Sequence, residues 1–194
     1  MVAAFLTGTG LASSSGLNAY LPLLILALVD RSSNIIDLNG GWAAISSTWA
    51  IIGLMIILPL ELVGDKIPRF DHLNDLAHSA IRPLAGAVCM AAVAGQAGGY
   101  KPALGFALGL VFAAAVHLFK MRARPSITRA TAGIGNPIQS TIEDTAVVAV
   151  SLAAVFLPWS IIPVVPLAGA LIWRSSRSLQ SSSGRVRFLY RGRS

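Results

Sequence analysis

Residues 103–119 read ALGFALGLVFAAAVHLF, a run without a charged side chain, and the basic segment KMRAR follows at residues 120–124. A helix needs about 20 predominantly apolar residues to cross a bilayer, within a range of about 17–25. Lys and Arg accumulate in the cytoplasmic segments of membrane proteins. This stretch is therefore predicted to be a membrane-spanning helix with its basic end in the cytoplasm.

The composition of the whole chain extends this prediction. Of its 194 residues, 55% are hydrophobic and 12% are charged, and the mean hydropathy is +0.70. Soluble domains carry about 25% charged residues, so a water-soluble globule is excluded. Long apolar runs between the few charges also exclude a disordered chain. We expect a polytopic membrane protein.

Apolar runs bounded by charge, Gly or Pro are the candidate spans. The third and sixth runs are short for a bilayer crossing, because a helix rises only about 1.5 Å per residue. The predicted fold class is all-α, a membrane helix bundle of about six transmembrane helices with an amphipathic cytoplasmic helix. The six runs are Val2–Val29, Trp42–Leu62, Pro83–Ala97, Ala103–Phe119, Ile138–Leu157 and Ile161–Trp173.

The basic residues indicate the orientation of these runs. The segments after the second, fourth and sixth runs hold 13 of the 15 Lys and Arg residues, and only Arg31 and Lys101 lie elsewhere. This asymmetry predicts that both termini are cytoplasmic. The net charge of +7 is then explained by contact with anionic lipid headgroups, and we expect no nucleic-acid partner.

Two domains are expected, a transmembrane domain over residues 1–174 and a basic cytoplasmic tail over residues 175–194. The tail alternates basic with apolar or aromatic residues, so it could lie on the membrane surface or bind a partner. Residues 1–15 lack the basic start of a signal peptide, and the first run is expected to remain as a span. Cys89, the one cysteine, is predicted to be a small core residue.

Polar residues interrupt the first run near its middle, at Ser13–Asn18, with Pro22 four residues further on. One interpretation is a broken helix that forms a transport site, since irregular backbone at membrane depth is tolerated only against protein or a wet cavity. The other is an unbroken helix with a small-residue packing face. The sequence leaves both open.

A polar stripe precedes the third run, because Asp71, Asp75, His78 and Arg82 share one face of an amphipathic helix. Pro83 is expected to open the following span. The stripe could face water at the membrane surface, or it could face inward at the cytoplasmic mouth of a pathway. Asp75 and His78 have the acid-x-x-His spacing of di-iron bundles, but the remaining ligands are not evident, so metal binding is undecided. No cofactor is expected.

Two adjacent acids, Glu143 and Asp144, lie inside the boundary of the fifth run, where ionisable side chains are costly. They could form a structural ion pair, or they could handle a proton or cation. Glu61 and His117, near the inner ends of their runs, could share an inner vestibule with these acids. The arginines considered as partners for the acids are Arg82, Arg122, Arg124 and Arg129.

The sequence thus predicts two groups of functional residues. The residues expected to handle the transported charge are Glu143, Asp144, Glu61, Asn18 and Asn136. The residues expected at the cytoplasmic mouth are Asp71, Asp75, His78, Arg82, Arg122 and Arg124.

Small residues indicate close helix packing. Gly105 and Gly109 form a GxxxG motif in the fourth run, which favours a tight bundle or a homo-oligomer. Similar X-Pro segments at Arg82–Pro83 and Asn136–Pro137 suggest two three-helix halves around Gly98–Gly99, in inverted orientation. Residue identity does not demonstrate this repeat.

Four motifs occur in order along the chain: Gly16–Pro22, Glu61–Pro68, Asp71–Pro83 and Gly135–Asp144. With them, residues 6–158 resemble an uncharacterised family of small bacterial integral membrane proteins, a domain of unknown function. The resemblance implies a bacterial plasma membrane location and about six spans. It supplies no activity.

Three functions are compatible with these features. The first is a small transporter or ion pathway, with the acids handling a proton or cation. The second is a non-catalytic accessory or assembly subunit of a larger membrane complex, for example a respiratory one. The third is an enzyme or flippase acting on lipid phosphates through the stripe of Asp71, Asp75, His78 and Arg82. No nucleophile–base spacing supports an enzyme.

Overall fold

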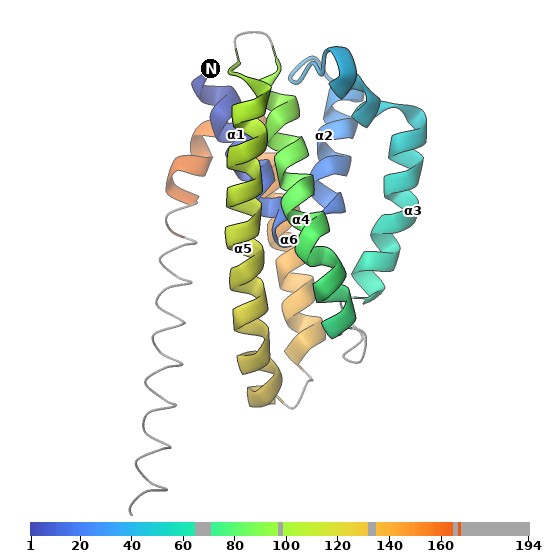
Figure 1. Ribbon diagram of the computed structural model, residues 1–194, viewed down its shortest axis with the longest axis vertical. Coiled ribbons are helices and arrows are strands. Elements are labelled where there is room, and N and C mark those ends of the chain that lie inside the picture. The colour runs from blue at the N-terminus through green and yellow to red at the C-terminus, as the bar shows by residue number, and fades with distance from the viewer. Residues whose placement is uncertain (65–70, 97–98, 132–134, 165–166, 168–194) are drawn as a thin grey trace, which may run out of the picture. The chain divides into compact units, whose positions relative to one another are not determined.

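The computed structural model describes residues 1–64, 71–96, 99–131, 135–164 and 167, and within these it describes no side chains for residues 63–78 and 123–137. The chain divides into two units, residues 1–161 and residues 162–194. The elements of the first unit are all helical across the described residues, and Figure 1 shows them. They are α1 (Val2–Ser15), α2 (Tyr20–Ser32), η1 (Gly40–Ser46), α3 (Thr48–Gly64), α4 (Asp71–Ala94), α5 (Pro102–Thr131), α6 (Gly135–Phe156) and η2 (Pro158–Ser160).

Two stretches are long and apolar enough to cross a membrane, Pro102–Arg122 in α5 and Ile138–Phe156 in α6. The bent pair of η1 and α3, with an angle of 48° between its parts, would make a third. Within the described residues, the helical bundle that the sequence predicts is therefore confirmed, with two or three candidate crossings. The sixth predicted run and the basic tail fall mainly on residues outside the description, and the arrangement in two inverted halves stays a prediction.

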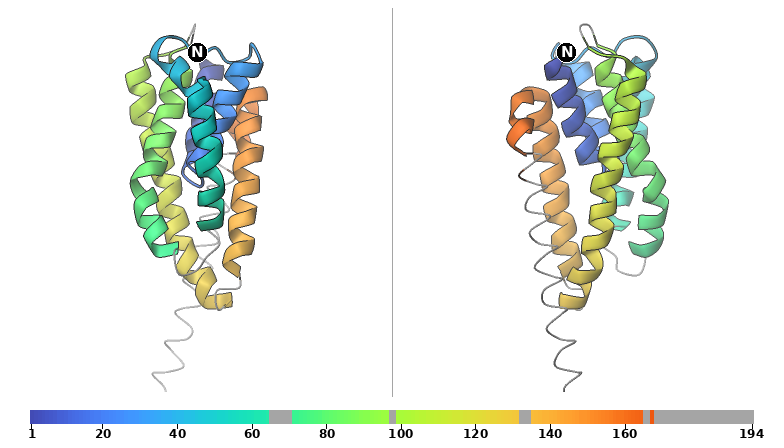
Figure 2. Two further views of the ribbon diagram at one scale, coloured as in Figure 1. Left: turned by 90° about the vertical axis from the view of Figure 1, so that its right-hand side faces the viewer. Right: turned by 60° about the vertical axis from the view of Figure 1, so that its left-hand side comes forward.

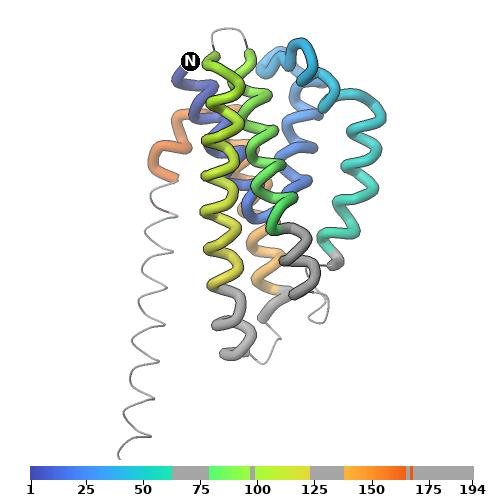
Figure 3. Tube along the Cα trace, in the orientation of Figure 1, coloured from blue at the N-terminus to red at the C-terminus, as the bar shows by residue number. Residues whose placement is uncertain are grey.

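The first predicted run is two helices rather than one. α1 ends at Ser15 and α2 begins at Tyr20, and the chain reverses between them, so that the N-terminus and the end of α2 lie at the same end of the bundle (Figure 3). Ala4 and Val29 accordingly belong to the same apolar cluster. The interpretation of this run as one unbroken helix is wrong, and the interpretation with a break near Ser13–Asn18 is confirmed as to the break. Hydropathy measures apolar length and not chain direction, so a re-entrant hairpin and a crossing helix have similar profiles.

This reversal also changes the position of the N-terminus. Both views in Figure 2 show α1 starting at the end of the bundle where α4 finishes and α5 starts. Lys120 and Arg122 lie more than halfway along α5 from that end. The N-terminus and these basic residues therefore lie toward different ends of the bundle, and the side of the membrane that each faces stays a prediction.

The amphipathic segment and the third predicted run form one helix. α4 continues without a break from Asp71 to Ala94, with Pro83 inside it. The expectation that Pro83 starts a helix is wrong. A proline inside a helix removes one backbone hydrogen bond, and here that loss occurs beside the fully buried Arg82.

The glycines of the GxxxG motif pack inside the chain. A Cβ on Gly105 would lie 2.8 Å from the Met90 carbonyl oxygen of α4, and a Cβ on Gly109 would lie 2.8 Å from the Met90 Cβ. Such close approach requires glycine on α5. The motif therefore joins α4 to α5 within one chain.

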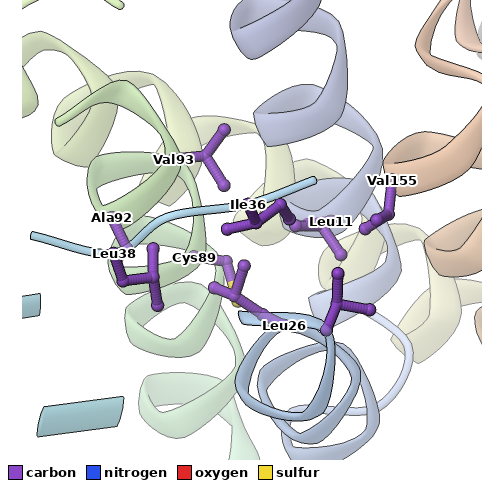
Figure 4. Close-up of a cluster of buried hydrophobic side chains, with 9 residues drawn as sticks. Leu11, Leu26, Ile36, Leu38, Cys89, Ala92, Val93 and Val155 are labelled. Atoms are coloured by element: carbon purple, nitrogen blue, oxygen red, sulfur yellow. The ribbon is translucent and has the colours of Figure 1, made fainter. Parts of the chain in front are cut away.

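The apolar core lies between the legs of the α1–α2 hairpin and α4. Figure 4 shows Leu11 of α1, Leu26 of α2 and Val93 of α4 in one cluster with Ile36 and Leu38 of the loop after α2. The free thiol of Cys89 is fully buried in the same cluster. The prediction that Cys89 is a core residue is confirmed.

Candidate functional site

The turn of the hairpin, residues 16–19, lies inside the bundle, and Asn18 is its central polar residue with 1% exposure. The Oδ1 of Asn18 accepts hydrogen bonds from the backbone N–H groups of Tyr20 (3.1 Å) and Leu21 (3.0 Å). This side chain therefore caps the first turn of α2. Its Nδ2 donates to Oδ1 of Asp144 on α6, at 3.2 Å. One side chain thus caps α2 and connects the turn to α6.

Lys120 of α5 makes a second connection to the same turn. Its Nζ donates to the backbone carbonyl oxygen of Leu17 at 2.9 Å. The same Nζ lies 3.0 Å from Oε2 of Glu143, and the Lys120 side chain is only 1% exposed. Gln139 donates from Nε2 to the other carboxylate oxygen of Glu143, at 2.7 Å. A charged lysine is therefore held between the turn and α6 by charge-assisted contacts.

The electrostatics of the two helix ends account for this arrangement. The C-terminal end of α1 presents carbonyl oxygens with partial negative charge, and the N-terminal end of α2 presents N–H groups with partial positive charge. The Lys120 ammonium lies at the first of these ends, while Asn18 satisfies N–H groups at the second. The turn can therefore interact with a cation at one helix end and with an anion at the other.

Glu61 and Arg82 form a buried ion pair between α3 and α4. Nη2 of Arg82 lies 3.2 Å from Oε1 of Glu61, and the two side chains are 0% and 1% exposed. Two charges this deep must be matched closely, because removal of either one leaves a buried charge. Glu61, predicted to handle transported charge, and Arg82, predicted at the cytoplasmic mouth, thus contact each other.

His117 of α5 adds a titratable group to this region. It is 2% exposed, and its Nε2 lies 3.2 Å from the Oγ of Ser79 on α4. His117 and Lys120 are three residues apart, so they share one face of α5. We use the term polar layer for this set of buried or half-buried polar residues: Asn18, Glu61, Arg82, His117, Lys120, Glu143 and Asp144.

The described side chains give the two acids partners that the sequence did not indicate. Glu143 contacts Lys120, Arg82 contacts Glu61, and Arg122 is exposed, while the side chains of Arg124 and Arg129 lie outside the description. Sequence reasoning missed Lys120, since a lysine at the end of an apolar run usually extends into the headgroups. Its three-residue spacing from His117, which places both on one helix face, was the available signal.

The remaining predicted residues lie where side chains are not described. Asp71, Asp75 and His78 belong to α4, Arg124 to α5 and Asn136 to α6. The proposed mouth and the acid-x-x-His motif therefore fall outside the described side chains. Among the side chains that are described, no cluster of three or more His, Cys, Asp or Glu residues could hold a metal ion.

At the opposite end of the hairpin, two aromatic side chains pack against each other. The rings of Phe5 and Tyr100 lie 5.8 Å apart, between centroids, at a tilted angle. Burial raises the pKa of Tyr100, in the connection between α4 and α5, to about 12. Its hydroxyl therefore stays neutral at physiological pH, in contrast to the charged groups around the turn.

Comparison with known proteins gives one match. The model of a family described as a domain of unknown function (DUF4126) matches residues 5–178. No curated protein and no solved structure matches the chain.

Proposed function

Because the chain belongs to the DUF4126 family, whose description specifies no activity, we propose a function from the site itself: a small integral membrane transporter or ion pathway. In this proposal, Glu143 and Asp144 handle a proton or cation at the turn of the α1–α2 hairpin. One observation supports this proposal most strongly. Asp144 binds Asn18 of the turn, and Glu143 binds Lys120, which itself contacts the turn.

Broken helices support such a role. In many transporters, discontinuous helices meet near the middle of the membrane and present their free backbone groups to the substrate and coupling ion. Irregular backbone at that depth requires protein or water around it. The turn at residues 16–19 has this character, because Lys120 contacts the Leu17 carbonyl and Asp144 contacts Asn18, which caps α2.

The proposed location is a bacterial plasma membrane. The apolar stretches of α5 and α6 would cross it, with exposed Arg122 near anionic headgroups on the cytoplasmic side. In this orientation Met1 lies at the outer end of the bundle. This placement replaces the cytoplasmic N-terminus predicted from the six-run arrangement.

The hairpin is the proposed moving element. Its two helices have 14 and 13 residues, and its turn is fastened to α5 by Lys120 and to α6 by Asn18. A proton or cation arriving at Glu143 or Asp144 would weaken the contact made by that acid. The occupancy of the acids would thereby control the position of the turn.

Reconstitution into liposomes tests this function. The full chain would be incorporated in proteoliposomes, and dissipation of an imposed membrane potential would be followed with a potential-sensitive dye at several pH values. We expect the wild type to dissipate the potential faster than empty liposomes, and Glu143→Gln and Asp144→Asn to reduce that rate about tenfold or more.

The matched control is Asp37→Asn, which removes an equal charge at an exposed position far from the turn in sequence. It should conduct as the wild type does. The proposal would be contradicted if vesicles with the wild-type protein dissipated the potential no faster than empty vesicles under proton, sodium and potassium gradients. Equal rates for the wild type and both acid variants would remove these two residues from the pathway.

A further inference from the structure

The surroundings of the Lys120 ammonium resemble the ligands of a monovalent metal ion. Its Nζ contacts two oxygens from different elements, the Leu17 carbonyl oxygen at 2.9 Å and Glu143 Oε2 at 3.0 Å. Asp144 lies next to Glu143 in sequence and binds Asn18, which is next to Leu17. One carboxylate and one main-chain carbonyl from different elements thus converge on the ammonium.

These oxygens suit a hard cation. Carbonyl groups at the C-terminal end of a half-helix coordinate Na⁺ in transporters built from broken helices, and carboxylates provide the compensating charge. A transition metal would require more nitrogen or sulfur ligands, and the described side chains hold no cluster of that kind. The ligand set therefore favours an alkali cation.

A lysine ammonium and an alkali cation carry the same single charge. Lys120 is joined to the backbone of α5 by a flexible four-carbon stem, so its ammonium can withdraw without movement of the helix. If a cation took its place, the positive charge among the oxygens would stay constant. A divalent ion would change that charge.

We propose that the oxygens of Leu17 and Glu143 contribute to a site for a monovalent metal cation, Na⁺ or K⁺, which Lys120 occupies with its own ammonium until the cation displaces it. The inference rests on the proposed function and specifies its substrate class. Displacement also breaks the contact between Lys120 and Leu17, so cation binding would release the contact of the turn with α5.

Removal of the lysine tests the proposal. The full-length protein with Lys120→Ala would be purified in detergent, and its melting temperature measured in NaCl, KCl, methylammonium chloride and choline chloride at equal ionic strength. The variant should melt below the wild type in choline chloride. Na⁺ or K⁺ at saturation should raise its melting temperature by about 3 °C or more, because a ligand that binds only the folded state stabilises it.

Two further variants serve as controls. Arg122→Ala removes an exposed positive charge two residues away on α5, and its melting temperature should respond to alkali cations and choline as that of the wild type does. Addition of Glu143→Gln to Lys120→Ala should abolish the stabilisation by Na⁺ or K⁺. If Lys120→Ala does not fold, Lys120→Met keeps the apolar stem without the charge and carries the same expectation.

The outcomes separate this inference from the proposed function. No difference between Na⁺, K⁺ and choline in a folded Lys120 variant overturns the inference, and so does stabilisation by methylammonium alone. If neither variant folds, stabilisation of the wild type by about 0.5 M Na⁺ or K⁺ relative to choline supports the site, and its absence overturns it. Transport in liposomes with no cation effect on melting would leave the proposed function standing and this site excluded.

Discussion

The two ends of the α1–α2 hairpin are built from different chemistry. Its legs bury Leu11 and Leu26 in an apolar cluster with Val93, whereas its turn is held by directional contacts through Asn18 and by Lys120 at Leu17. Apolar packing depends on filling volume and is insensitive to charge. Charged contacts in a dry environment depend on the state of each partner. The difference suggests that the legs anchor the hairpin while its turn responds to ions.

The largest expected effect tests whether the polar layer relies on charge balance. Arg82→Met removes one member of the fully buried pair with Glu61, and should lower the free energy of unfolding by about 3–5 kcal/mol. The double variant Arg82→Met with Glu61→Gln should recover most of this loss. Chemical denaturation in detergent measures both, and a double variant no more stable than the single one would contradict charge balance as the cause.

The next effect tests the legs. Leu26→Ala leaves a cavity at a fully buried position, and should cost about 2–5 kcal/mol. The rate of ion flux per folded molecule should remain near that of the wild type, because no charged contact changes. Denaturation and liposome flux, normalised to reconstituted protein, would be compared. If Leu26→Ala lowers the flux as much as Asp144→Asn does, the legs and the turn are not separate in function.

A smaller loss of stability is expected at the turn itself. Asn18→Ala removes the cap of α2 and the contact with Asp144, at a cost of about 1–2 kcal/mol. The flux per folded molecule should fall much more than this modest loss of stability would cause by itself. Asn18→Asp keeps an oxygen cap but places a second carboxylate beside Asp144, so it should also lower flux. Wild-type flux in both variants would mean that the turn has no part in the pathway.

The smallest effect concerns the edge of the polar layer. Ser79→Ala deletes the hydroxyl that lies 3.2 Å from His117, and should reduce stability by about 0.5–1.5 kcal/mol. Thermal denaturation in detergent provides the measurement, with Ser46→Ala, at a half-buried serine of η1, as the control. A loss of several kcal/mol would show that His117 is central to the polar layer rather than at its edge.

Much of the helical architecture was predictable because apolar runs and helix length are local properties. The run at 103–119 lies within α5, and the run at 138–157 matches α6 to within a few residues. The prediction of one span for the first run was wrong for a physical reason. Gly16, Asn18 and Pro22 indicated an interruption, but a break and a reversal carry the same local signals.

The candidate site was less predictable. Glu61, Asp144 and Asn18 were recognised as polar residues in apolar surroundings, since the cost of burying them depends only on their position. Their partners depend on which helices become neighbours, so the Glu61–Arg82 contact and the role of Lys120 emerge only from the fold.

The re-entrant path of the first two helices is the central claim, and the sidedness of Met1 relative to Arg122 tests it most directly. Single cysteines would replace exposed Val2 or Arg122 in a chain with Cys89→Ser, and a membrane-impermeant maleimide would be applied to sealed vesicles of known orientation. The account predicts labelling from opposite sides, with Val2→Cys reactive from outside and Arg122→Cys from the cytoplasm. Labelling of both from one side would make the first run a crossing helix and remove the turn from the centre of the bundle.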